Sequence, residues 1–97
     1  MVLYENLYER EGNDSWLKDY VQLHHNDMGL YLEHKKRWDG WSGEIKENYT
    51  LDLDLDDIET SQEKIDNYIE EHSLYKKYPS GKEEGVVINL KEFFRQN

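Results

Sequence analysis

An alternation of apolar and polar residues from 30 to 55, interrupted by an Asp-Gly dipeptide, constrains this chain more than any other feature. Asp39 and Gly40 suit the two positive-φ positions of a type I′ turn, which connects neighbouring antiparallel strands. A two-residue loop here predicts three cross-strand pairs: Trp38 with Trp41, Lys35 with Glu44, and Glu33 with Lys46. The same register gathers the leucines of both arms on one face. We therefore expect a hairpin with one apolar and one charged face.

A third strand is expected upstream of this hairpin. Val21 and Leu23 alternate with polar neighbours, and residues 26–29 have the composition of a turn. Pairing Val21 with His34 and Leu23 with Leu32 keeps the apolar face continuous. The three strands therefore form an antiparallel meander.

A helix is expected downstream. Residues 60–63 (Thr-Ser-Gln-Glu) match a capping box, and Ile65, Tyr68 and Ile69 follow with the spacing of one helix face. That face is expected to pack on the apolar side of the sheet.

The rest of the chain completes the predicted fold. Residues 78–81 indicate a turn, residues 85–88 a short buried strand, and Asn89 the cap of a terminal helix, whereas residues 2–9 fit either an edge strand or a short helix. The sequence thus predicts one α+β domain over residues 1–97. It is an antiparallel β-meander of about four or five strands, with one helix packed across a face and a short C-terminal helix. No motif identifies a protein family.

Composition narrows the class of protein. The chain has 97 residues, no cysteine and a formal net charge of −10. This length predicts one domain with a single core. The lack of cysteine argues against disulfides and thiolate metal sites and favours a cytoplasmic protein, and we expect neither a membrane span nor a signal peptide. The absence of alanine, with abundant Lys, Asn, Ile and Tyr, indicates an AT-rich coding sequence, as in a low-GC bacterium or its phage.

The negative charge is concentrated in residues 52–71, which contain nine acids and one base. Asp52, Asp54 and Asp56 alternate with leucines, so one strand is expected to point them into solvent as a row that the following helix continues. One interpretation is a solvated face that keeps the protein soluble. The other is a surface that docks on a basic partner, because self-repulsion along the row lowers stability.

The candidate partner-binding residues, named here the acidic strip, are Asp52, Asp54, Asp56, Asp57, Glu59, Glu63, Asp66 and Glu70. Trp38 and Trp41, at the end of the hairpin, are a further candidate anchor for a partner, the alternative being that they cap the core.

Patterns for catalysis and metal binding are weak. The chain has no nucleophile elbow and no glycine-rich phosphate loop, so we expect no enzyme activity. Residues 52–63 place oxygen-bearing side chains as an EF-hand loop does, but Asp57 stands where the sharp turn needs glycine. We therefore expect no metal and no cofactor. Nucleic-acid binding is not expected either, because basic residues are few against the net charge.

The histidines leave one alternative open. His25 and His34 are expected on the same face near Asp27, which would suit a metal or small-ligand site of two histidines and one carboxylate. A buried His34 that is hydrogen-bonded to a neighbour is the plainer interpretation.

The sequence thus predicts a small, acidic, non-enzymatic protein that acts by binding a partner protein with a basic surface. Phage-encoded inhibitors and toxin-immunity proteins are often small and acidic in this way, an analogy of composition alone. The alternatives are the His25/His34 module and a structural protein whose acidity serves only solubility.

Overall fold

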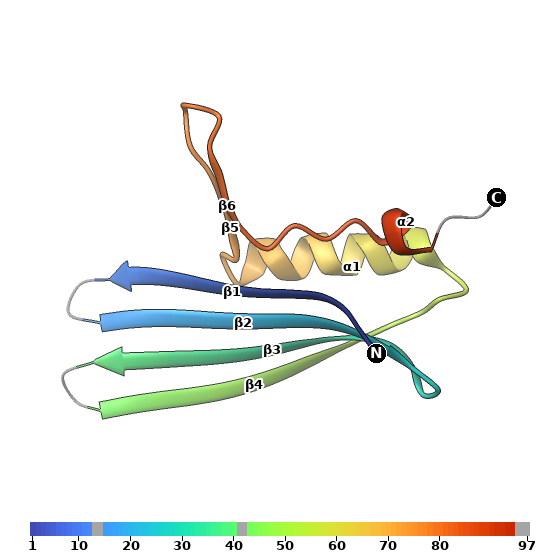
Figure 1. Ribbon diagram of the computed structural model, residues 1–97, viewed down its shortest axis with the longest axis horizontal. Helices are drawn as coiled ribbons and strands as arrows, with labels where there is room; N and C mark the ends of the chain where they lie inside the picture. Colours follow the sequence, from blue (N-terminus) through green and yellow to red (C-terminus); the bar gives the residue numbers. More distant parts are fainter. Residues whose placement is uncertain (13–14, 41–42, 95–97) are drawn as a thin grey trace.

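The computed structural model describes residues 1–12, 15–40 and 43–94, which form two antiparallel sheets and two helices (Figure 1). The larger sheet has the order β1-β2-β3-β4, so each strand pairs with the next along the chain, as in a meander. Its strands are β1 (Val2–Gly12), β2 (Ser15–Asn26), β3 (Gly29–Gly40) and β4 (Gly43–Leu53).

A helix, a small hairpin and a short helix follow the sheet. They are α1 (Ile58–Glu71), β5 (Tyr75–Lys77), β6 (Glu83–Gly85) and α2 (Leu90–Phe93). We name the sheet face that carries Leu23 and Leu32 the inner face, because both leucines share the buried core with Ile65 of α1. The β5–β6 hairpin stands away from the sheet, and the strand ends near Gly12 and Gly40 extend past α1 (Figure 1). The α+β architecture expected from the sequence is confirmed.

Neither helix of the described ranges is long and apolar enough to cross a membrane.

The N-terminal segment, which the sequence left undecided, is a strand. β1 pairs with β2, with a register irregularity between Val2 and Tyr4. Its inner positions include Asn6 and Arg10, whose side chains donate hydrogen bonds to Gly85 O (3.1 Å) and to Ser73 O (2.7 Å). Polar side chains can occupy these inner positions because they hydrogen-bond to other parts of the fold. β1 therefore lacks the alternation of apolar residues by which a strand is recognised in a sequence.

The expected pairing of β2 with β3 is confirmed. Val21 lies opposite His34 and Leu23 opposite Leu32. In the turn, the Met28 amide donates to Asn26 Oδ1 at 2.8 Å, and Gly29 has a φ of 124°.

The expected register between β3 and β4 is wrong. Lys35 lies opposite Asn48 and not Glu44, Glu33 lies opposite Thr50 and not Lys46, and Trp38 lies opposite Ile45. The pair that closes the described ladder is Gly40 with Gly43, and Trp41 lies outside the described residues. The shift is four residues, an even number, so the expected apolar and polar faces survive it.

Packing of leucines explains the observed register. It places Leu32 opposite Leu51 and Leu30 opposite Leu53, whereas the expected register would have set Leu32 against Glu47. It also pairs Glu47 with Lys36, the charged residues that β4 and β3 carry on the inner face. Burial of the leucine pairs therefore outweighed the Asp-Gly turn preference.

The helix begins earlier than the capping box predicts. Asp57 is the N-cap, and its carboxylate accepts from the Thr60 amide at 3.1 Å and from Thr60 Oγ1 at 2.8 Å. Ser61 is buried, and its hydroxyl donates to Asp54 O and accepts from the Asp54 amide, each at 2.8 Å. The Thr60 and Ser61 hydroxyls, which lie within α1, therefore hydrogen-bond to residues that precede the helix and stabilise its start.

Residues 86–88 are not the expected strand of the sheet. β6 ends at Gly85 and pairs only with β5, in a separate two-stranded sheet. A Cβ on Gly85 would lie 2.0 Å from Leu74 O, and its φ is 105°, so the chain turns here as only glycine allows. The turn near Gly81 is confirmed, as is the Asn89 cap, whose Oδ1 accepts from the Lys91 amide at 3.1 Å.

Candidate functional site

The acidic strip does not form one continuous surface. All eight of its carboxylate residues are exposed. Asp52 lies opposite Tyr31 in the sheet, on the outer face, whereas α1 packs on the inner face. β4 ends at Leu53, so Asp54 and Asp56 do not extend the expected row along a strand.

Two acids of the strip have local structural roles. Asp54 Oδ1 accepts from the Asp56 amide at 2.8 Å. Asp57 caps α1, and its hydrogen bonds from Thr60 hold the pKa of its carboxyl below the usual value. Helix capping explains Asp57 without a partner.

The remaining acids form a row along α1. Glu59, Glu63, Asp66 and Glu70 follow one another at spacings of four, three and four residues, which aligns them on one helix face. Like charges at these spacings destabilise a helix. The last turn of α1 contains no base, so its acids also oppose the helix dipole. Helix stability accounts for Glu59, an acid in the first turn, but not for the rest of the row.

The C-terminal half of the row borders an open groove of about 660 Å³ between α1 and residues 83–88. We name it the acidic groove. Three acids line it, Asp66, Glu70 and Glu83, together with Ser73. Its apolar wall consists of Ile69, Tyr75, Val86, Val87 and Ile88. No base lines it, and Lys77 contacts one of its acids, Glu83, at 3.9 Å, whereas Asp66 and Glu70 have no basic partner among the described ion pairs.

The apolar wall of the acidic groove is held in place by side chains from other elements. The Val87 amide donates to Tyr4 Oη at 3.1 Å, and Gln62 Nε2 donates to Ile88 O at 2.9 Å. Val87 is nevertheless 58% exposed and Tyr75 is 37% exposed. The groove is therefore pre-formed and presents apolar side chains to solvent, as protein-binding surfaces do.

Trp38 lies on the inner face in the part of the sheet that extends past α1. It is flanked by Leu17 on β2 and Ile45 on β4, and the three side chains stand outside the buried core cluster. Ile45 is 57% exposed, whereas Trp38 is partly buried, and its ring lies 4.4 Å from Lys36 Nζ. Trp38 does not cap the core, and Trp41 lies outside the described residues.

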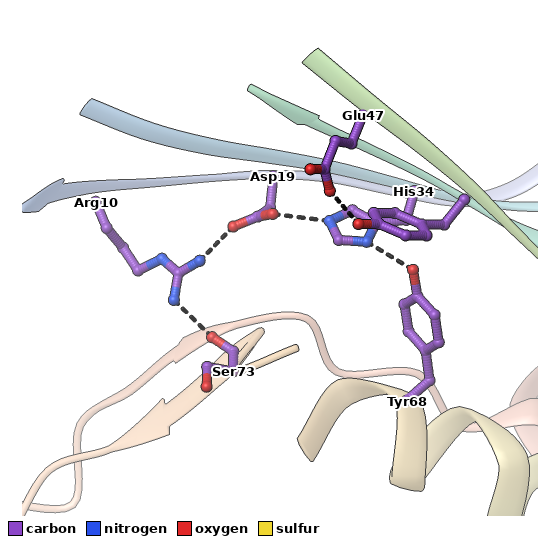
Figure 2. A network of polar contacts seen from close by, with 7 residues as sticks. Arg10, Asp19, His34, Glu47, Tyr68 and Ser73 are labelled. Carbon is purple, nitrogen blue, oxygen red and sulfur yellow. Dashed lines mark hydrogen bonds and ion pairs between the residues drawn. The ribbon is translucent and has the colours of Figure 1, made fainter. Parts of the chain in front are cut away.

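A buried polar network connects the sheet to α1 (Figure 2). His34 Nε2 lies 2.7 Å from Asp19 Oδ1, and His34 Nδ1 lies 2.7 Å from Tyr68 Oη. Arg10 donates to the second oxygen of Asp19 and also to Ser73 O, just beyond the end of α1. Asp19 and His34 are 0% and 1% exposed, so these contacts replace their hydration almost completely.

The network stabilises charge and holds elements together. Burial raises the pKa of the Asp19 carboxyl, but the hydrogen bond from His34 and the charge of Arg10 outweigh burial and hold the pKa below its usual value. Burial raises the pKa of the Tyr68 hydroxyl, so Tyr68 stays protonated at neutral pH and is not an activated nucleophile. Burial beside the charge of His34 lowers the pKa of His72.

The structure does not assemble the alternative site of His25, His34 and Asp27. His25 lies opposite Leu30 and His34 opposite Val21, which separates the two histidines by four positions along the strands, about 13 Å. Both ring nitrogens of His34 have partners, as the interpretation of a satisfied core histidine requires. Across the described ranges, no group of three or more His, Asp and Glu side chains has the arrangement of a metal site.

Basic residues of the two hairpins, β3–β4 and β5–β6, contact nearby acids. Arg37 contacts Asp39 at 3.1 Å and Glu44 at 2.9 Å. In the β5–β6 hairpin, Lys82 contacts Glu84 at 3.1 Å.

The sequence identified Asp66 and Glu70 of the acidic groove but not its apolar wall. Val87 belongs to residues 85–88, which the sequence predicts to form a short buried strand. In an extended segment neighbouring side chains point in opposite directions, so burial of Val86 and Ile88 turns Val87 outward. Asp19 and Arg10 of the network were also missed, because nothing local marks an acid on an apolar face as ion-paired.

The chain matches no protein-family model, and comparison with curated proteins and with solved structures gave no significant match.

Proposed function

We propose that this protein acts by binding a partner protein, and that the acidic groove receives a basic, partly apolar segment of that partner. The observation that carries the proposal is the convergence of three carboxylates and an exposed apolar wall in one groove without a base. We place the interaction in the cytoplasm and assign the protein no chemistry of its own, as expected for an inhibitor or immunity-type protein.

Electrostatics favour a cationic segment. Asp66 and Glu70 lie near the C-terminal end of α1, where the helix dipole adds to their negative potential. A lysine or arginine bound there relieves the repulsion within the acidic row and pairs with the helix terminus. The unfavourable placement of these acids in the free protein thus becomes favourable in the complex.

The apolar wall supplies contact area that charge alone does not. Burying the exposed parts of Val87 and Tyr75 removes apolar surface from water, which is the dominant favourable contribution to most protein association. In an extended segment that alternates lysine with valine, successive side chains point to opposite sides. The lysines can therefore face the carboxylates of α1 while the valines face the apolar wall.

The proposal is tested with a twelve-residue peptide of alternating lysine and valine, titrated into the ¹⁵N-labelled protein. We expect amide shift changes centred on Ile69, Val87 and Ile88. The paired variant Asp66→Asn/Glu70→Gln should weaken binding about tenfold and reduce its dependence on salt.

The matched control is Asp56→Asn/Glu59→Gln, which removes the same charge from exposed positions outside the groove. Equal weakening by both variants would show attraction to net charge only, and shift changes away from the groove would refute the proposed site. Val87→Ser tests the apolar wall, since it leaves every carboxylate in place and should still weaken binding.

A further inference from the structure

The two edges of the four-stranded sheet are treated differently by the fold. β1 has a register irregularity between Val2 and Tyr4. The side chains of Asn6 and Tyr4 also hydrogen-bond to the backbone of Gly85 and Val87, so the segment after β6 lies beside this edge. β4 pairs with β3 without interruption from Leu53 to Gly43. It contains no proline, and no other strand of the described residues pairs with its free side. A long, regular edge strand offers its unpaired backbone groups to another strand.

We propose that β4 pairs with β4 of a second copy of this chain, antiparallel across a two-fold axis, so that the two sheets become continuous. Strand addition of this kind forms main-chain hydrogen bonds, and side chains then select the partner and register. A two-fold axis makes the contact self-complementary and closed.

The sequence of β4 favours a register centred on Tyr49. That register sets Lys46 opposite Asp52 of the other copy twice, and these residues both belong to the outer face. On the inner face it sets Ile45, which is 57% exposed, opposite Leu53 of the other copy. It also sets Glu47 opposite Leu51, where the Glu47 carboxylate keeps its hydrogen bond from the Tyr49 hydroxyl. An apolar side chain that the monomer leaves in solvent thus gains an apolar neighbour.

Neighbouring registers fit less well. A centre at Asn48 places Glu44 opposite Asp52 within both strands, and like charges directly opposite are destabilising. The Tyr49 centre instead places Glu44 opposite Asp54, which lies beyond the end of β4. A centre at Thr50 places Lys46 opposite Asp54, which lies beyond the end of β4 and whose amide already bonds Ser61.

The first test is the mass of the protein in solution, measured by sedimentation across concentration. We expect a dimer, and Lys46→Glu should raise its dissociation constant at least about tenfold by placing two acids opposite each other. Lys46→Glu/Asp52→Lys reverses both charges and should restore the dimer. A wild-type chain that stays monomeric at about 1 mM would overturn the proposal.

Disulfide trapping then fixes the register, since the chain contains no cysteine. Asn48→Cys and Thr50→Cys alter exposed positions, and the proposed pairing predicts oxidation to a mixed disulfide only when the two variants are combined. Cα atoms opposite each other in antiparallel strands are about 4.5 or 5.5 Å apart, within disulfide reach. Self-linking of either variant alone would refute the Tyr49 centre, and a dimer without any crosslink would refute β4 as the interface.

Salt separates this contact from the function proposed above. Two chains of net charge −10 repel at long range, so added salt should strengthen self-association. Binding of a basic segment in the acidic groove should weaken under the same conditions. Failure of one proposal therefore leaves the other intact.

Discussion

The inner face of one sheet has two halves built from the same strands. In the covered half, Leu23 and Leu32 lie beneath α1 with exposures of 0% and 1%. In the projecting half, Leu17, Trp38 and Ile45 continue the same alternation, but they stand outside the core cluster. Alternation thus selects the face of a strand, and the reach of the covering helix decides how much of that face is buried.

The buried network marks the boundary between the halves. Asp19 and His34 lie between the leucine core and the row that contains Trp38. Arg10 and Tyr68 bind them from the projecting half and from α1 (Figure 2). The following changes test whether stability resides in the covered half and its boundary.

The largest effect is expected from Asp19→Ala. The change leaves Arg10 and His34 without their buried carboxylate, which should lower the free energy of unfolding by about 3–5 kcal/mol, as measured by urea denaturation. Glu9→Ala, an exposed acid on the neighbouring strand, is the control and should change little. If Asp19→Ala lowered the free energy of unfolding no more than Glu9→Ala does, the network would be dispensable for stability.

Asp19 also predicts a pH dependence. Its pKa is lower in the folded than in the unfolded state, so its contribution is complete above about pH 4 and is lost as the pH falls further. The unfolding free energy of the wild type should therefore fall on acidification more steeply than that of Asp19→Asn. Parallel curves for the two proteins would contradict the depressed pKa.

Leu32→Ala and Ile45→Ala compare the halves directly. The first opens a cavity beneath α1 and should lower the unfolding free energy by about 2–5 kcal/mol. The second shortens a side chain that is 57% exposed and should have an effect below about 1 kcal/mol at concentrations where the chain is monomeric. Equal losses would mean that another surface covers the projecting half.

Gly85→Ala tests the segment that closes the covered half beside β1. The added Cβ would lie 2.0 Å from Leu74 O at a φ of 105°, so the backbone must shift. We expect a loss of about 2 kcal/mol and faster amide exchange over residues 86–88. Gly81→Ala is the control, because a Cβ there has no neighbour within 4 Å although φ is also positive.

A smaller loss than for Gly85→Ala is expected from Ser61→Ala, at the start of α1. The variant leaves the Asp54 amide without its hydroxyl partner, which should lower stability by about 1 kcal/mol. Thr50→Ala, an exposed position on β4, is the comparison and should stay within about 0.5 kcal/mol of the wild type. Thermal unfolding of the two variants under identical conditions measures the difference.

The sequence by itself determined the meander of β2, β3 and β4, the faces of these three strands and the presence of both helices. Alternation set Val21 opposite His34, and apolar residues at spacings of three and four placed the inner side of α1. These are local patterns, because the periods of a strand and a helix sort side chains before any tertiary contact forms.

Tertiary structure alone decided the register of β3 with β4, the partners of buried charges and the position of the acidic groove. The Asp-Gly dipeptide favoured one register, but pairing Leu32 with Leu51 stabilised another. β6 ends at Gly85, so residues 86–88 join neither described sheet, and Val87 lines the groove together with Glu70. Each outcome depends on burial between segments far apart in the chain, and such burial has no period that a sequence can display.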